Sequence, residues 1–232
     1  MDIFSPQHLA EAWDIVCTEF GLAIWETLYV TLLSTFFAFL IGLPLGVLLV
    51  VGRKDGICPL PQPLMRALDI LINILRSVPF LILMILVIPL TRLLLGTAVG
   101  TAPTIVPLTI AAFPFVARLV EGSLREVSPN IIETAESMGA TPYQIIREVM
   151  IPESVPSLIG NVTLTLTTVL GYSAMSGIIG GGGLGKIAIN YGYYRYKDLV
   201  MLLAVILLIV IVQAFQSIGT YLAKRSDKRL KK

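Results

Sequence analysis

Long stretches without a charged residue constrain this chain more than any other feature. Residues 27–52 contain no Asp, Glu, Lys or Arg, and residues 199–223 form a second uncharged stretch of 25 residues. A transmembrane helix needs about 20 consecutive, mostly apolar residues, so both stretches are predicted to span a membrane. Hydrophobic residues make up 56% of the 232 residues, and charged residues make up 14%, against about 25% charged in soluble domains. Lipid must therefore solvate part of the chain, which disfavours a soluble enzyme or a disulfide-stapled secreted domain.

Three further spans follow from shorter or interrupted stretches. The second span has to include Arg76, because only 15 uncharged residues separate it from Arg92. Residues 154–185 are uncharged over 32 residues; two spans would need about 40, so we predict one span and then a glycine-rich, non-helical segment. The prediction is an all-α integral membrane protein with a single transmembrane domain, residues 1–232. Its five spans cover residues 22–52, 70–91, 101–121, 154–175 and 199–223, and a loop covers residues 122–153.

The distribution of basic residues predicts the orientation. Residues 1–26 contain five acidic residues and no Lys or Arg, whereas residues 224–232 contain six Lys or Arg. With five spans, twelve of the 17 basic residues fall on one side and four on the other, and Arg76 lies within the membrane. Because basic residues accumulate on the cytoplasmic side, the N-terminus is predicted outside, and the C-terminus and the 122–153 loop are predicted in the cytoplasm.

Residues that support metal binding or catalysis are scarce. Cys17 and Cys58 lie 41 residues apart, and His8 is the single histidine, so we predict no metal site, no cofactor and no catalytic site. Residues 180–186 match the phosphate-binding pattern G-x-x-x-x-G-K. Ile187 stands where that pattern needs Ser or Thr, and no buried strand precedes the segment. We interpret the glycines as a flexible outer mouth or hinge of a pathway.

The 122–153 loop carries the signals of two short helices. Ser128-Pro129 predicts a helix start, and Gly139 predicts its end with a left-handed backbone. Thr141 and Gln144 have the spacing of a capping box that begins the next helix, and Pro152 is predicted to end that helix. Each helix has a small apolar face, which needs a partner at the ends of the spans or on another protein.

This loop resembles the EAA loop of ABC-importer permeases, the inner-membrane components of binding-protein-dependent transporters. The pattern Glu133-x-Ala135-x3-Gly139-x9-Val149-x-Ile151-Pro152 is similar to E-A-A-x3-G-x9-I-x-L-P, with conservative replacements. In that family the loop docks in a groove of the ATP-binding subunit. The resemblance implies that the residues coupled to the ATPase are Glu133, Ala135, Met138, Gly139, Ala140, Thr141, Pro142 and Pro152.

The similarity extends over nearly the whole chain to the permeases of methionine importers. It rests on stretches such as Ile41–Val47, Arg76–Phe80, Ser137–Pro142, Gly171–Met175 and Gly182–Gly185. It implies a five-span permease homodimer in the bacterial inner membrane that imports L- and D-methionine, with two ATPase subunits, an external substrate-binding protein and no nucleic acid. Related amino-acid or peptide importers remain alternatives. An ion-coupled transporter is disfavoured, because the fourth and fifth spans contain no ionisable residue.

The translocation pathway and the N-terminal segment are less constrained. Tyr172, Ser173 and Met175 lie where the fourth span meets the glycines, the region that lines the path in similar importers. Met175 could be a flexible gate or ordinary packing. Arg76 either pairs with Asp69 or helix-end carbonyls, or it lines the path. The segment with Leu9, Trp13, Val16 and Phe20 at helical spacing is either an amphipathic helix on the outer surface or a helix packed on the bundle.

Overall fold

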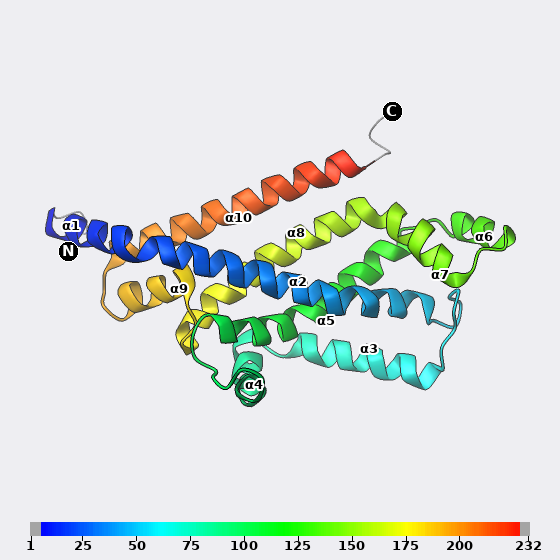
Figure 1. The fold of residues 1–232 in the computed structure, drawn as a ribbon, viewed down its shortest axis with the longest axis horizontal. Coiled ribbons are helices and arrows are strands. Elements are labelled where there is room, and N and C mark those ends of the chain that lie inside the picture. Colours follow the sequence, from blue (N-terminus) through cyan, green and yellow to red (C-terminus); the bar gives the residue numbers. More distant parts are fainter. Residues whose placement is uncertain (1–5, 228–232) are drawn as a thin grey trace. The chain divides into compact units, whose positions relative to one another are not determined.

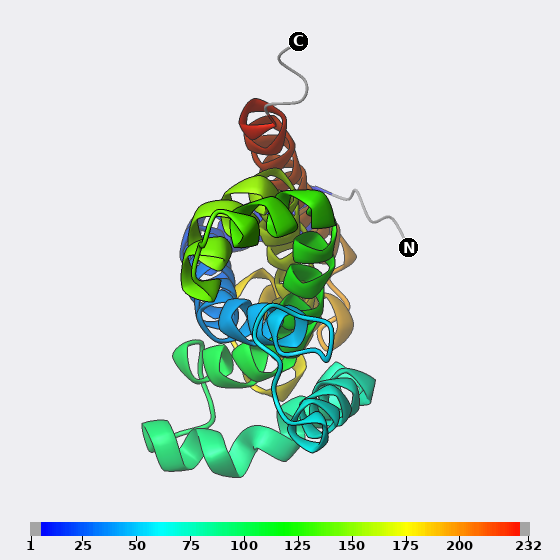
Figure 2. The same cartoon turned by 90° about the vertical axis from the view of Figure 1, so that its right-hand side faces the viewer.

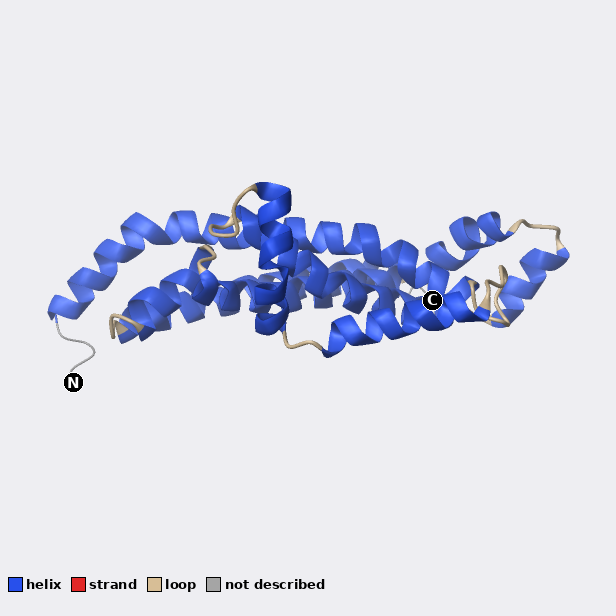
Figure 3. Ribbon diagram, turned by 90° about the horizontal axis from the view of Figure 1, so that it is seen from below, coloured by secondary structure: helices blue, strands red, loops and turns tan. Residues whose placement is uncertain are grey.

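The computed structural model describes the backbone of residues 6–227 and the side chains of residues 9–227. The side chain of His8 and the basic residues 228–232 lie outside this part. All regular elements in the described residues are helical (Figure 3). The α-helices, labelled in Figure 1, are α1 (Pro6–Ile15), α2 (Gly21–Val51), α3 (Gln62–Ser77), α4 (Phe80–Leu95), α5 (Ile105–Arg125), α6 (Pro129–Ser137), α7 (Pro142–Gln144), α8 (Ile151–Ser176), α9 (Gly183–Ile187) and α10 (Asp198–Ser226). Short 3-10 turns (Ala102–Thr104, Gly177–Ile179) and π-helical turns (Val16–Phe20, Ile145–Met150, Ala188–Tyr193) lie between them.

The chain divides into two compact units. Unit 1 consists of Met1–Thr35, Pro79–Ile110 and Leu166–Phe215, and unit 2 of Phe36–Val78, Ala111–Thr165 and Gln216–Lys232. The end of α2, the α2–α3 loop, the end of α5 and α6 all belong to unit 2, and Figure 2 looks onto them.

Unit 1 has a core in which the N-terminal segment takes part. Ala12 and Ile15 of α1 are buried in a cluster with Leu184 of α9 and Val200 of α10, whereas Trp13 is exposed. The N-terminal segment is therefore a helix that packs on unit 1, which is one of the two alternatives that the sequence left open. A π-helical turn joins it to α2, and together they form one long apolar candidate span, Leu9–Val51.

Unit 2 is built on close packing of α2 against α5. A Cβ atom on Gly42 would lie 2.8 Å from the carbonyl oxygen of Phe113, and one on Gly46 would lie 2.7 Å from that of Ala117. No side chain fits at either distance, so only glycine allows the two backbones to approach this closely. Such small-residue contacts are how helices associate in lipid, where apolar burial alone does not drive them together.

The predicted second span, residues 70–91, is not one continuous helix. It is two helices, α3 and α4, interrupted at Val78 and Pro79, which are both extended with ψ of 125° and 135°. Proline restricts the residue before it to extended conformations, which explains the break. The described residues contain four helices long and apolar enough to cross a membrane, or five if the broken α3–α4 pair is one span. The all-α prediction is confirmed, and the count of five depends on that pair.

Two other expectations need correction. Pro152 does not end a helix, because it lies in the first turn of α8 and residues Pro142–Ile179 form one 38-residue candidate span. The π-helical turn Ile145–Met150 directly precedes α8, and proline is tolerated in the first turn of an α-helix. The glycine segment is also not wholly non-helical, because it contains the 3-10 turn Gly177–Ile179 and the short helix α9.

Candidate functional site

The two-helix element at residues 129–144 has the local structure that the sequence predicts. Pro129 is the first residue of α6, although the side chain of Ser128 makes no capping hydrogen bond. Gly139 has a φ of +80°, which confirms the left-handed end of the helix. Its N–H donates to the carbonyl of Glu136 at 2.9 Å, and the N–H of Ala140 donates to that of Ala135 at 3.1 Å. These bonds satisfy carbonyl groups that the end of α6 would otherwise leave free.

The capping box at the start of α7 is confirmed. The N–H of Gln144 donates to Oγ1 of Thr141 at 3.4 Å, and the N–H of Thr141 donates to Oε1 of Gln144 at 2.8 Å. The two helices therefore meet at a turn that is fixed by local hydrogen bonds and one glycine. This turn sets the direction in which α6 and α7 present their side chains.

Large apolar side chains are exposed on this element, among polar ones. Met138 is 83% exposed, and Ile131 and Tyr143 are exposed as well. Ala135 and Ala140 are half-buried, and Glu133 and Pro142 are exposed. Large apolar side chains exposed together on a short element are typical of a docking surface for another protein.

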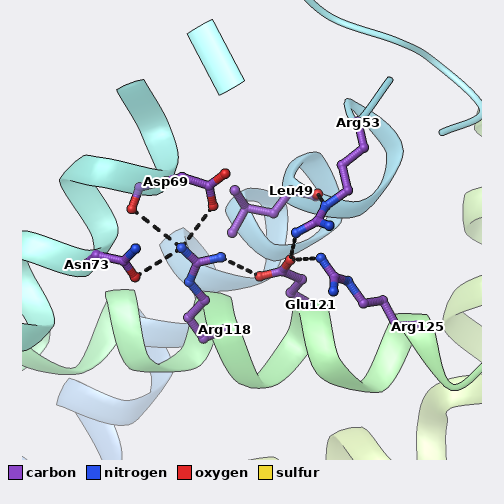
Figure 4. Close-up of polar contacts among 7 residues, drawn as sticks. All are labelled: Leu49, Arg53, Asp69, Asn73, Arg118, Glu121 and Arg125. Carbon is purple, nitrogen blue, oxygen red and sulfur yellow. Dashed lines mark hydrogen bonds and ion pairs between the residues drawn. The ribbon is translucent and has the colours of Figure 1, made fainter. Parts of the chain in front are cut away.

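An ion-pair network, which the sequence did not suggest, lies beside this element in unit 2 (Figure 4). Glu121 of α5 is buried, and its carboxylate accepts hydrogen bonds from Arg53 at 2.8 Å, Arg118 at 2.7 Å and Arg125. Arg118 also reaches α3, where it lies 2.9 Å from Asp69. The network joins the end of α2 and the middle of α3 to the end of α5, just before the chain enters α6.

A second polar link joins α5 to α8 in the same unit. The side-chain amide of Asn161 donates to the carbonyl of Leu119 at 3.0 Å and to Oγ of Ser123 at 2.7 Å. The hydroxyls of Ser123 and Ser157 lie 2.7 Å apart. Hydrogen bonds of this kind stabilise helix pairs in a membrane. Both helices that lead into and out of the two-helix element are therefore tied together.

The predicted pathway residues lie in different units. Tyr172, Ser173 and Met175 are on the part of α8 in unit 1. Tyr172 stacks on Phe80 with ring centroids 4.5 Å apart, Ser173 is buried, and Met175 is exposed by almost half. Arg76, in the last turn of α3, is exposed and belongs to unit 2. Asp69 pairs with Arg118, and no ion pair of Arg76 is found among the described residues.

The glycine segment is clamped within unit 1. Glu26 of α2 accepts hydrogen bonds from the N–H of Gly183 at 2.7 Å and from the hydroxyl of Thr101 at 2.8 Å. Oγ1 of Thr27 accepts one from the N–H of Leu184 at 2.9 Å. A Cβ on Gly182 would lie 2.1 Å from Oγ1 of Thr101, so the segment needs glycine to fit. Within the described residues, no group of three or more His, Cys, Asp or Glu could hold a metal ion.

Comparison with known proteins identifies the family. Residues 42–228 match the family described as binding-protein-dependent transport system inner membrane component. The chain is 52% identical over 207 residues to a probable D-methionine transport system permease protein MetI of Vibrio cholerae, which covers 89% of this chain and 92% of that protein. It is 49% identical over 154 residues to the D-methionine transport system permease protein MetI of Escherichia coli, and this match covers 66% of this chain and 70% of that protein.

Solved structures agree with this result. A chain from the MetNI methionine ABC transporter in inward-facing conformations matches with a TM-score of 0.88 and 45% identity, over 90% of this chain and 96% of that one. An amino acid ABC transporter crystallised with histidines matches with a TM-score of 0.73 and 20% identity, over 89% of this chain and 93% of that one. At this identity the match shows a likeness of fold alone. This chain belongs to the family of inner-membrane components of binding-protein-dependent transport systems.

Proposed function

We propose that this chain is the permease subunit of an ATP-driven ABC importer that carries methionine into the bacterial cytoplasm. The observation that carries the proposal is the similarity over most of the chain to permeases named for methionine transport. A second copy of the chain, two ATP-binding subunits and an external substrate-binding protein complete the importer. The chain itself has no catalytic site and needs no cofactor, because ATP is hydrolysed by the partner subunit.

The two-helix element is the part that couples this chain to the ATPase. The exposure of Ile131, Met138 and Tyr143 supports this role, because large apolar side chains exposed together favour contact with another protein. The turn at Gly139 fixes the angle between α6 and α7, so movement of a docked subunit is passed to the membrane helices through rigid segments. The residues proposed to act in coupling are Glu133, Ala135, Met138, Gly139, Ala140, Thr141, Pro142 and Pro152.

Met175 is proposed as the gate of the pathway, with Tyr172 and Ser173 beside it. An unbranched, flexible, apolar side chain can seal a path and reopen it, and the partial exposure of Met175 supports such mobility. The stack of Tyr172 on Phe80 keeps the neighbouring turn of α8 rigid. Arg76 is proposed to line the path rather than to act as a structural ion pair, because Asp69 is engaged by Arg118.

We further propose that the chain forms one transmembrane domain with its N-terminus outside and its C-terminus in the cytoplasm. The test is cysteine labelling in intact cells, after Cys17 and Cys58 have been replaced by alanine, because both are exposed. A membrane-impermeant reagent should modify a cysteine placed at Ser5 and leave one at Ser226 unmodified. Modification of both positions from outside would refute the five-span orientation.

The transport proposal is tested by reconstitution. The permease and its ATPase are placed in proteoliposomes with the binding protein outside, and uptake of radiolabelled L- and D-methionine is measured with ATP inside. We expect uptake that requires ATP and the binding protein and that unlabelled methionine suppresses. Uptake of a different amino acid or peptide would refute methionine as the substrate and leave the importer assignment standing. Uptake driven by an ion gradient without the ATPase would refute the importer assignment itself.

A further inference from the structure

A groove of about 540 Å³ lies in unit 2 between the end of α2 and α6. Its lining includes the apolar residues Val51 of α2, Ile132 of α6 and Met150. This volume is within the range of about 300–1,000 Å³ that is typical of small-molecule sites. The groove is separate from the exposed apolar surface of Met138 and Tyr143, neither of which lines it.

Charges of both signs line the groove. Arg53 follows α2 and Arg125 ends α5, and both guanidinium groups are partly exposed (Figure 4). The carboxylates come from Glu133 and Glu136 of α6 and from Asp55 of the α2–α3 loop. A groove lined by both cations and carboxylates suits a ligand that carries both a negative and a positive group.

The two arginines keep donors for such a ligand. A guanidinium has five N–H donors. Arg53 uses its Nε for the carbonyl of Leu49 at 3.2 Å and one terminal nitrogen for Glu121, and Arg125 uses one terminal nitrogen for the same carboxylate. Because these two cations share one buried carboxylate with Arg118, positive charge and free N–H groups remain for an anionic oxygen, the acceptor that arginine recognises best.

The groove lies at the level where two membrane spans end. The candidate span Leu9–Val51 ends at a residue of its lining, and the candidate span Ala102–Arg125 ends at another. Lipid headgroups occupy this level of a membrane, just beyond the hydrocarbon core. Asp55, Glu133 and Glu136 of the lining come from the segments that follow these two spans in the chain.

We propose that this groove binds the headgroup of a zwitterionic phospholipid with a primary ammonium, phosphatidylethanolamine. Its phosphate lies against Arg53 and Arg125, its ammonium donates to Asp55 and Glu136, and its glycerol covers Val51. An anionic lipid fits less well, because three carboxylates line the same groove. A choline headgroup fits less well, because its trimethylated ammonium has no N–H to donate. The proposal rests on the groove and the span ends, and it does not depend on which substrate is transported.

The experiment compares lipids retained by the purified permease–ATPase assembly. The assembly is delipidated in detergent, and it is then incubated with equal amounts of dioleoyl phosphatidylethanolamine, phosphatidylcholine and phosphatidylglycerol. Native mass spectrometry counts the bound molecules. We expect phosphatidylethanolamine to be retained at least about fivefold over the other two. The double variant Asp55→Asn/Glu136→Gln should lose this preference, and Glu126→Gln, an acidic residue that does not line the groove, should keep it.

Three results would overturn the proposal. The first is equal retention of the three lipids by the wild-type assembly, and the second is an unchanged preference in the double variant when gel filtration shows an intact assembly. The third is retention of soluble glycerophosphoethanolamine in place of the lipid, which would make a diffusible molecule the occupant. If lipid binds the isolated permease and leaves when the ATPase binds, the groove is a protein contact and the proposal fails as well.

Discussion

The carboxylate of Glu121 is expected to be the strongest electrostatic support of unit 2. Glu121→Gln keeps the shape of the side chain, but it removes the negative charge and leaves one acceptor oxygen for three guanidinium groups. The Glu121 side chain is 6% exposed and that of Arg118 is 18% exposed, whereas those of Arg53 and Arg125 are 47% and 44% exposed and can be hydrated. Removing one partner of a buried ion pair costs about 3–5 kcal/mol, and exposed pairs contribute about 0.2–1 kcal/mol. With one mostly buried and two half-exposed partners, we expect a loss of about 3 kcal/mol, more than 100-fold in the unfolding equilibrium.

The assay is unfolding of the permease by SDS in mixed micelles, followed by the fluorescence of its two tryptophans. A double-mutant cycle separates the partners. The coupling between Glu121→Gln and Arg118→Gln should be about 2–3 kcal/mol, and that between Glu121→Gln and Arg53→Gln should stay below about 1 kcal/mol. Equal coupling to both arginines would refute the reasoning, because burial would then not decide the strength of these pairs. A loss of less than about 0.5 kcal/mol in the single variant would show that Glu121 is not a structural centre of the unit.

Three further predictions concern the glycines and the gate. Gly139→Val should reduce ATPase retention and uptake without affecting membrane insertion, because a left-handed conformation costs an ordinary residue about 1–2 kcal/mol, although no atom blocks a Cβ there. Gly139→Asn should be milder, and normal co-purification of the ATPase with the valine variant would contradict the coupling role. Gly42→Ala should destabilise the permease by about 1–3 kcal/mol in the SDS assay through overpacking. Gly122→Ala, where a Cβ meets open space, should have little effect, and equal effects of the two variants would refute the close approach of α2 and α5. Met175→Ala should raise substrate leak or uncoupled ATP hydrolysis in proteoliposomes, and a variant identical to wild type in both would make Met175 ordinary packing.

The sequence predicts best those features that short segments determine. The turn at Gly139 and the capping box of Thr141 and Gln144 depend on residues three or four apart, so their signals are complete in the sequence. The EAA pattern is also local, because it lies within 20 residues from Glu133 to Pro152. The family that it indicated is confirmed by the match of residues 42–228. The roles proposed for the individual coupling and gate residues stay predictions.

Features that depend on distant residues or on backbone geometry were predicted less well. Counting uncharged residues locates a span, but it does not show that the chain is interrupted at Pro79. The Glu121 network joins Arg53 and Glu121, which are 68 positions apart, and Arg118 and Asp69, which are 49 apart. No local pattern relates such residues, and the sequence offered Arg76 as a partner of Asp69, which the structure pairs with Arg118 instead. The signal that could have indicated part of the network is the spacing of Arg118, Glu121 and Arg125, which are three and four residues apart and therefore lie on one face of a helix.

The hydrogen bond between Glu26 and the N–H of Gly183 implies a long delay during synthesis. The two residues are 157 positions apart in the chain. At translation rates of about 5–20 residues per second, roughly 8–30 s pass between the emergence of Glu26 and that of its partner. During this time α2 is already available to enter the membrane, while the carboxylate still lacks the amide that will bind it. Glu26 lies at the very start of the uncharged stretch, where water can solvate it until the glycine segment arrives. The N-terminal end of α2 therefore reaches its final structure only after most of the chain has been made.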